Sequence, residues 1–194
     1  MTDDATALRE ILTRAGATTA QPETVAVPIP APNGNGAEDK LTIIAWSGQL
    51  DRLWPTLILS TTAVACGMQS VVFFTFWGLF GLVKPGRRIT GADWMTRALS
   101  LMNAGGPHKA KLSRYHFRGA GPWMMKRIAR RHKVSEPREL LDLAQEMGVR
   151  LIPCQMTMDL MGLTGDDLVD GLEEPVGAAT ALLHMKESSV SLFI

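Results

Sequence analysis

Cysteine is scarce in this sequence, whose two thiols are Cys66 and Cys154. They lie far apart in the chain and match neither a disulfide framework nor the paired ligands of a zinc ribbon. The opening stretch, MTDDATALREILTRAG, has acids where a secretory signal needs bases followed by an apolar run. We therefore expect a cytoplasmic protein in which one or both of these cysteines carry out any sulfur chemistry.

Acidic residues are absent from one long segment. Residues 94–135 contain ten Lys and Arg and no Asp or Glu, whereas residues 136–187 contain eleven acids against three bases. The net charge of +1 conceals this segregation. We expect one part of the surface to be positive and another part to be negative.

Charge is also absent from residues 53–83, a stretch long enough to span a bilayer. The same stretch divides into a helix that ends at Gly67 and a following run of β-branched and aromatic residues. A central parallel strand that is covered on both faces would lack charge for the same reason. We favour the soluble interpretation and leave open whether this stretch touches a bilayer.

Proline and glycine gather near the N-terminus. Residues 15–39 contain four prolines and an Asn-Gly-Asn-Gly cluster, so they cannot bury enough surface to offset their ordering entropy. We predict a flexible tail or linker over residues 1–39 and one folded domain over residues 40–194. Within that domain, residues from about 79 to 135 have a looser pattern and are predicted to form a basic helical insertion.

Apolar runs of strand length alternate with helical patterns in the rest of the domain. Strands are expected near residues 40–46, 68–77, 149–154, 168–173 and 189–194, and helices near 51–66, 93–103, 121–133, 136–148, 155–161 and 176–188. The alternation predicts an α/β fold with a doubly wound, mostly parallel five-stranded sheet. With one changeover in direction it would resemble a flavodoxin-like sheet, although the sequence alone does not fix the strand order. In such sheets, ligands and chemistry lie at the carboxyl ends of the strands.

Cys154 ends the predicted strand VRLIPC and precedes the predicted helix QMTMDLM, which puts it at this carboxyl edge. Unpaired N–H groups and the positive end of a helix dipole favour a thiolate over a thiol. An accessible thiolate can accept sulfane sulfur as a persulfide and pass it to another thiol. The alternative is a buried apolar cysteine that fills the strand end, since free cysteines are commonly buried.

Residues at the neighbouring strand ends are expected to line the same crevice, where small side chains leave room for a carried sulfur or a visiting thiol-bearing tail. This expected lining consists of Ser47, Gly48, Trp77, Gly78, Gln155 and Met156.

Two motifs and the last residues of the chain resemble a known family. FFTFWGL at residues 73–79 and CQMTMDLMG at residues 154–162, followed by the closing SVSLFI, are similar to the DsrE/DsrF-like family, in particular to its larger hydrophobic members. The resemblance covers about residues 40–194. It implies a sulfur-carrier or sulfurtransferase-like protein, usually a homo-oligomer, that works with rhodanese- and TusA-type partners in sulfur oxidation or tRNA thiolation. It also implies that Cys154 is the sulfur-binding cysteine.

Members of this branch are sometimes labelled peroxiredoxin-family proteins, and the sequence does not support that label. A peroxidatic cysteine lies in a Pro-x-x-x-Thr-x-x-Cys frame, and neither Cys66 nor Cys154 has Pro and Thr at those positions. Cys66 lies at the C-terminal end of a predicted helix, where the dipole disfavours a thiolate. We predict a structural role for Cys66 and no disulfide between the two cysteines.

No metal or cofactor is predicted. Met156, Met158 and Met161 stand near Cys154 and would suit copper(I), but helix packing explains Met158 and Met161 without metal. The four histidines, His108, His116, His132 and His184, lack the paired spacing of zinc ligands. No glycine-rich nucleotide-binding motif occurs.

The basic segment ends in a predicted amphipathic helix. Along it, the apolar residues Trp123, Met124 and Ile128 alternate with the cations Lys126, Arg127, Arg130 and Arg131. This pattern suits a membrane surface, and a solvated face on a helix packed against the core is the alternative. Nucleic acid is not expected as a partner.

The sequence therefore predicts a sulfur carrier that binds sulfane sulfur on Cys154 and relays it to a partner protein. Whether sulfurtransferase-type catalysis accompanies carriage is left open. The alternative is a non-catalytic interaction or membrane-peripheral protein, in which the basic helices are the functional surface and Cys154 is structural.

Overall fold

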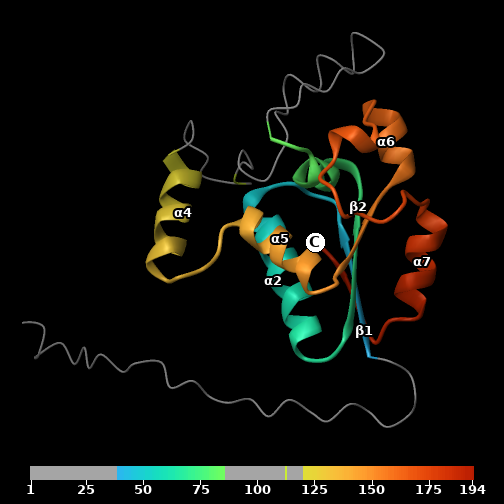
Figure 1. Cartoon of the computed structure of the whole chain (residues 1–194), viewed down its shortest axis with the longest axis horizontal. Helices are drawn as coiled ribbons and strands as arrows, with labels where there is room; N and C mark the ends of the chain where they lie inside the picture. The colour runs from blue at the N-terminus through green and yellow to red at the C-terminus, as the bar shows by residue number, and fades with distance from the viewer. Residues whose placement is uncertain (1–38, 86–111, 113–119) are drawn as a thin grey trace, which may run out of the picture. The chain divides into compact units, whose positions relative to one another are not determined.

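The computed structural model describes residues 39–85, 112 and 120–194. The described part of the chain forms a parallel sheet with helices on both faces (Figure 1). Its strands are β1 (Lys40–Ala45), β2 (Gln69–Phe74), β3 (Arg150–Pro153) and β4 (Val190–Phe193). Its helices are α2 (Leu50–Ala65), α4 (Ala120–Arg131), α5 (Pro137–Glu146), α6 (Gln155–Met161) and α7 (Ala178–Lys186), with two 3₁₀ helices, η1 (Phe76–Leu82) and η4 (Gly165–Asp167).

All three strand pairings are parallel, and the order across the sheet is β3-β2-β1-β4. The chain proceeds from β1 through β2 to β3 in one direction and returns to β4 on the other side of β1. The predicted parallel α/β fold is confirmed. The strand order, which the sequence left open, differs from the flavodoxin-like one. That order places β1 between β2 and β3, whereas here β2 lies between β1 and β3.

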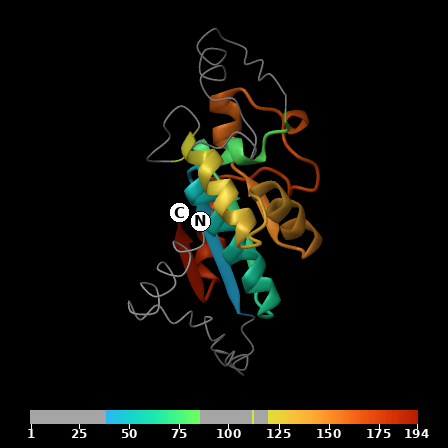
Figure 2. The same ribbon diagram turned by 90° about the vertical axis from the view of Figure 1, so that its left-hand side faces the viewer.

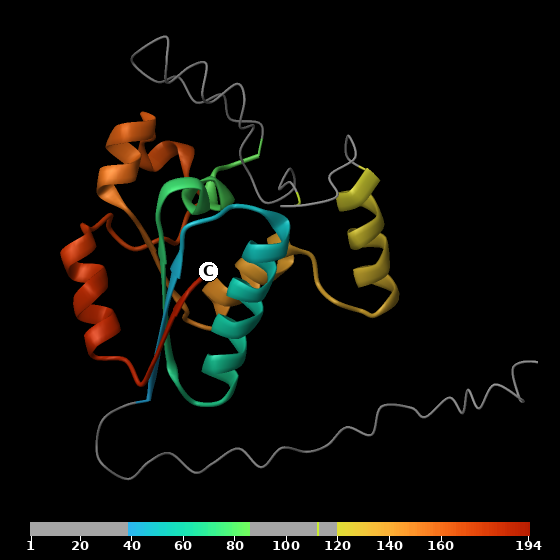
Figure 3. The ribbon, with the colours of Figure 1, turned by 180° about the vertical axis from the view of Figure 1, so that it is seen from behind.

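The two faces of the sheet bury different clusters. Alternate residues of β1 and β2, such as Ile43 and Val72, join the larger apolar cluster under α2 and α5, which pack against each other (Figure 2). Residues of opposite parity, such as Ile44 and Val71, join a smaller cluster with Ala181 of α7. Figure 3 shows from behind that α7 covers the face opposite to α2. This period of two follows from the alternating direction of side chains along a strand.

The charge-free stretch 53–83 divides as predicted, into most of α2, then β2 and η1. Cys66 caps the C-terminus of α2, and Gly67 turns the chain with a positive φ of 82°. Both cysteines are free, as predicted. Among the described helices, none has the length and apolar character needed to cross a membrane.

Two predicted strands differ from the structure. Strand β2 stops at Phe74 rather than residue 77, because Phe76 takes a positive φ of 46° and begins η1. The predicted strand at residues 168–173 is wrong, and the described sheet has four strands rather than five. Leu168 forms only an isolated antiparallel bridge with Val83, since the backbone there bonds to Leu82 and Lys84 instead of to the sheet.

The predicted basic insertion is only partly described. Its predicted helix near 121–133 corresponds to α4, whereas its predicted helix near 93–103 lies outside the described residues. The boundaries of the tail, the domain and the insertion remain predictions.

Candidate functional site at the carboxyl edge of the sheet

Cys154 directly follows β3 and is the N-cap of α6. Its backbone N–H donates to the carbonyl oxygen of Phe74 at the end of β2, at 2.9 Å. Its own carbonyl oxygen accepts the N–H of Met158 at 3.0 Å, which is the first hydrogen bond of the new helix. The extended backbone of the strand therefore becomes helical at Cys154, as the sequence predicted.

The ends of β1 and β2 approach each other so closely that two positions admit only glycine. A Cβ atom on Gly48 would lie 2.5 Å from the carbonyl oxygen of Trp77, and one on Gly78 would clash with the carbonyl oxygen of Ala45. The N–H of Gly78 donates to the carbonyl oxygen of Trp46 at 3.0 Å. Four of the predicted lining residues thus belong to two segments in direct contact: Ser47 and Gly48 to the loop after β1, and Trp77 and Gly78 to the start of η1.

Thr157 of α6 ties the end of β2 to the helix that follows Cys154. Its Oγ1 accepts the N–H of Phe76 at 3.1 Å and lies 3.2 Å from Oγ1 of Thr75. Phe76 has the left-handed conformation that non-glycine residues rarely adopt, and this hydrogen bond helps to hold it there. Sequence reasoning missed Thr157, although it was the one hydroxyl in the motif CQMTMDLMG.

The side chain of Cys154 is almost completely buried, with 1% of its surface exposed. It belongs to the smaller apolar cluster, with Phe73, Ile152 and Ala181 and the partly buried Val176. The loop after β1 and the 3₁₀ helix η1 contain four of the predicted lining residues and flank the larger cluster, to which Leu79 and Leu82 of η1 belong. The cysteine and this part of its predicted lining therefore share one edge of the sheet but face different layers.

Residues 173–176 run along the outer edge of β3 and cover Cys154 from the side. The N–H of Val176 donates to the carbonyl oxygen of Pro153 at 3.1 Å, and the N–H of Gln155 donates to the carbonyl oxygen of Val176 at 3.0 Å. Cys154 and Val176 form an isolated parallel bridge. We call residues 173–176 the covering segment, because they pair with β3 as a fifth strand would.

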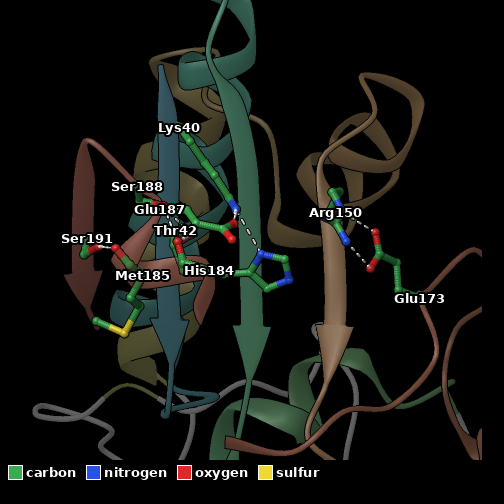
Figure 4. A network of polar contacts seen from close by, with 9 residues as sticks. All are labelled: Lys40, Thr42, Arg150, Glu173, His184, Met185, Glu187, Ser188 and Ser191. Carbon is green, nitrogen blue, oxygen red and sulfur yellow. Dashed lines mark hydrogen bonds and ion pairs between the residues drawn. The ribbon is translucent and has the colours of Figure 1, made fainter. Parts of the chain in front are cut away.

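One ion pair fastens the covering segment to β3. The guanidinium of Arg150 donates two hydrogen bonds to the carboxylate of Glu173, one of them from Nη2 to Oε2 at 2.9 Å (Figure 4). Both side chains are partly exposed, at 43% for Arg150 and 37% for Glu173. The hydrogen bond to Glu173 raises the pKa of Arg150 above its ordinary value.

A second polar network holds α7 over the face of the sheet on which Cys154 is buried (Figure 4). Nζ of the buried Lys40 lies 2.9 Å from Nδ1 of His184 and 2.9 Å from Oε2 of Glu187. Because the ammonium group can only donate, Nδ1 of His184 accepts, which requires the neutral ring in its Nε2–H tautomer. Burial, reinforced by the charge of Lys40, lowers the pKa of His184. The hydrogen bond from Lys40 lowers the pKa of Glu187.

The remaining predicted lining residues lie on the solvent side of the edge. Gln155 is exposed and its amide donates to Oδ1 of Asp159, and Met156 is 56% exposed. Met158 and Met161 are instead buried in the larger cluster, where they pack with apolar side chains. In the described residues, His, Cys, Asp and Glu form no group of three or more that could hold a metal ion.

Parallel α/β topology and a cysteine between a strand and a helix define a class of α/β proteins with a thiol at the carboxyl edge. The chain belongs to the DsrE/DsrF/DrsH-like family, whose model matches residues 37–193. It is 35% identical over 155 residues to the uncharacterized protein YrkE of Bacillus subtilis, covering 80% of this chain and 96% of that protein. It is also 35% identical over 167 residues to the sulfur carrier protein DsrE2 of Allochromatium vinosum, covering 81% and 99% respectively. The predicted family is confirmed.

Proposed function

We propose that this chain is a sulfur carrier that binds sulfane sulfur as a persulfide on Cys154 and passes it to a partner protein. Its family and its relative named a sulfur carrier protein support a sulfur-relay role. The observation that carries the assignment to Cys154 is its position between β3 and α6, at the carboxyl edge of a parallel sheet. Cys66, the other thiol, caps the C-terminus of α2 and has no such position.

The proposed chemistry is thiol exchange. In loading, the Cys154 thiolate attacks the terminal sulfur of a persulfide or polysulfide and forms a new S–S bond. The S–S bond of the donor breaks, and the donor leaves as a thiolate or as a polysulfide that is shorter by one sulfur. In unloading, a thiolate of the partner attacks the outer sulfur, and Cys154 leaves as a thiolate. Each step exchanges one S–S bond for another, so neither an oxidant nor a reductant is consumed. The proposed location is the cytoplasm, where thiols stay reduced.

Loading requires that Cys154 become accessible, because its side chain is buried. The covering segment is the part that can move at least cost, since it is held to β3 by few hydrogen bonds and one partly exposed ion pair. We propose that it opens while β3 and α6 keep their positions. Gln155 and Met156 would then flank the approaching donor or acceptor, whereas Ser47, Gly48, Trp77 and Gly78 would remain at the other layer.

The proposed partners are sulfur-relay proteins of the rhodanese or TusA type and further copies of this chain. Apolar side chains on α7 and β4 support self-association. Leu182 is 64% exposed, Leu183 57%, Val190 42% and Phe193 69%. A second copy on this face would bury surface that otherwise stays in contact with water.

The competing function is a non-catalytic interaction protein in which Cys154 only fills the core. The 1% exposure of Cys154 is the observation that favours it. The two functions differ in whether Cys154 ever reacts in the folded protein.

Intact-mass spectrometry of the reduced protein, before and after incubation with polysulfide, tests the proposal. The test uses a Cys66→Ser background, because the exposed Cys66 would also react. In this background we expect one or more sulfur atoms to be gained, and we expect the further substitution Cys154→Ser to abolish the gain. Alanine tolerates burial better than serine does, so Cys154→Ala is the control for misfolding caused by a buried hydroxyl group. In the Cys66→Ser background, loading of Cys154→Ser and Cys154→Ala to the level seen with Cys154 intact would contradict the proposal.

A further inference from the structure

Helix α4 presents large apolar side chains to solvent. Trp123 is 64% exposed, Met124 57% and Ile128 45%, whereas Gly121 and Ala129 are buried. Ala129 joins the larger apolar cluster, so this side of α4 is the side that packs inward. Trp123 lies on the side opposite to Gly121 and Ala129. Met124 and Ile128 lie between that side and Gly121, so these exposed apolar side chains are not covered by the described residues.

The exposed side of α4 consists of two neighbouring rows, because residues four apart lie one above the other on a helix. One row is Trp123, Arg127 and Arg131, and the other is Met124 and Ile128. The guanidinium of Arg127 lies over the ring of Trp123, 5.6 Å from its centroid. Apolar and cationic groups thus stand side by side on one face.

The cations of α4 fall into two groups. Arg130 and Lys126 pair with Glu136, the N-cap of α5, at 2.6 Å and 3.9 Å, and so help to join α4 to the following helix. In the part of the chain that the structure describes, no acid pairs with Arg127 or Arg131. These two charges lie in the exposed row.

We propose that this face of α4 binds an anionic lipid surface, with the helix axis parallel to the membrane. Arg127 and Arg131 would contact lipid headgroups, while Met124, Ile128 and the ring of Trp123 would enter the boundary between headgroups and acyl chains. The absence of acids from residues 94–135 removes the repulsion that an acidic side chain would add.

A lipid surface fits this face better than nucleic acid or an acidic protein does. Binding to phosphates alone needs cations and gains nothing from the exposed Met124 and Ile128, whereas an interfacial helix needs both kinds of side chain. The proposal does not depend on Cys154, and Cys154→Ser is expected to leave lipid binding unchanged.

Co-sedimentation of the full chain with vesicles tests the proposal. We expect binding to vesicles of phosphatidylcholine mixed with phosphatidylglycerol, little binding to phosphatidylcholine alone, and weakening by added salt. Arg131→Glu should lower the partition coefficient about thirtyfold, because one attraction is replaced by one repulsion. Lys186→Glu, which makes the same charge change on the exposed end of α7, is the matched control and should have little effect.

The apolar row is tested separately. Ile128→Ser should lower the partition coefficient about tenfold. Brominated lipids should quench part of the tryptophan fluorescence of the bound protein, and this quenching should disappear in Trp123→Phe. No binding at low salt, equal losses in Arg131→Glu and Lys186→Glu, or indifference to Ile128→Ser would overturn the proposal. The last of these outcomes would point to a phosphate-rich or acidic macromolecule instead.

Discussion

Replacing Glu173 by Gln should make Cys154 react faster without unfolding the protein. The substitution removes the charge that pairs with Arg150 and so loosens the covering segment along β3. The backbone hydrogen bonds of Val176 and Gln155 remain, so the covering segment still closes. The variant shifts an opening equilibrium and leaves the site itself unchanged.

The size of the shift follows from the exposure of the pair. The side chains are 43% and 37% exposed, so solvent screens their attraction, and the bidentate geometry places the pair near the upper end for surface ion pairs. We take about 1 kcal/mol for the loss. If opening precedes reaction, the reaction rate of Cys154 rises about fivefold, by the ordinary relation between free energy and population.

The assay is the rate at which a coloured disulfide reagent modifies Cys154 in a Cys66→Ser background, since the exposed Cys66 would react first. Asp142→Asn is the control, because it breaks the comparably exposed pair of Asp142 with Arg138 on α5, away from the covering segment. An unchanged rate in Glu173→Gln, or an equal rise in Asp142→Asn, would refute the reasoning. The reasoning would also be refuted if the rate of modification of Cys154 depended on denaturant concentration as steeply as global unfolding does.

Three further predictions concern stability. Gly78→Ala should lower the free energy of unfolding by about 3 kcal/mol or more, because the added Cβ would clash with the backbone of β1. The control Gly165→Ala places a Cβ in open space and should change the free energy of unfolding by less than about 0.5 kcal/mol. Equal effects of the two substitutions in denaturant titrations would contradict this prediction. Because the pKa of His184 is lowered in the folded protein, the unfolded chain binds this proton first as the pH falls. The free energy of unfolding of the wild type should therefore decrease as the pH drops below 6.5, and that of His184→Gln should decrease less. Parallel plots of unfolding free energy against pH for the two proteins would contradict this prediction. Thr157→Val should cost about 1–2 kcal/mol by leaving the N–H of Phe76 unpaired, and Thr157→Ser should recover most of it; equal losses in the two variants would show that the hydroxyl is not the cause.

Local patterns predicted the elements near Cys154 well. The β-branched and aromatic run after Gly67 and the apolar run before Cys154 each correspond to a strand, since burial on both faces of a central sheet selects such residues. The position of Cys154 between strand and helix follows from these two local patterns. Family membership could be predicted because the two motifs that surround this edge are short and continuous.

Contacts between distant segments could not be predicted in the same way. Leu168 and Val169 have the composition of a strand, yet their backbone is paired by residues 82–84, which adjoin them only in the fold. Strand order depends on where each crossover lands, and no local pattern records that. The burial of Cys154 likewise depends on the covering segment and α7, which follow it in the chain.

Site mapping of the persulfide in the folded wild type tests the central claim most directly. The protein is incubated with polysulfide, trapped with an alkylating reagent and digested with trypsin, which separates the two cysteines into different peptides. The account predicts that the peptide containing Cys154 gains a sulfur atom and loses it again when an acceptor thiol is added before trapping. Added sulfur confined to the peptide containing Cys66, or found on Cys154 only after denaturation, would contradict it.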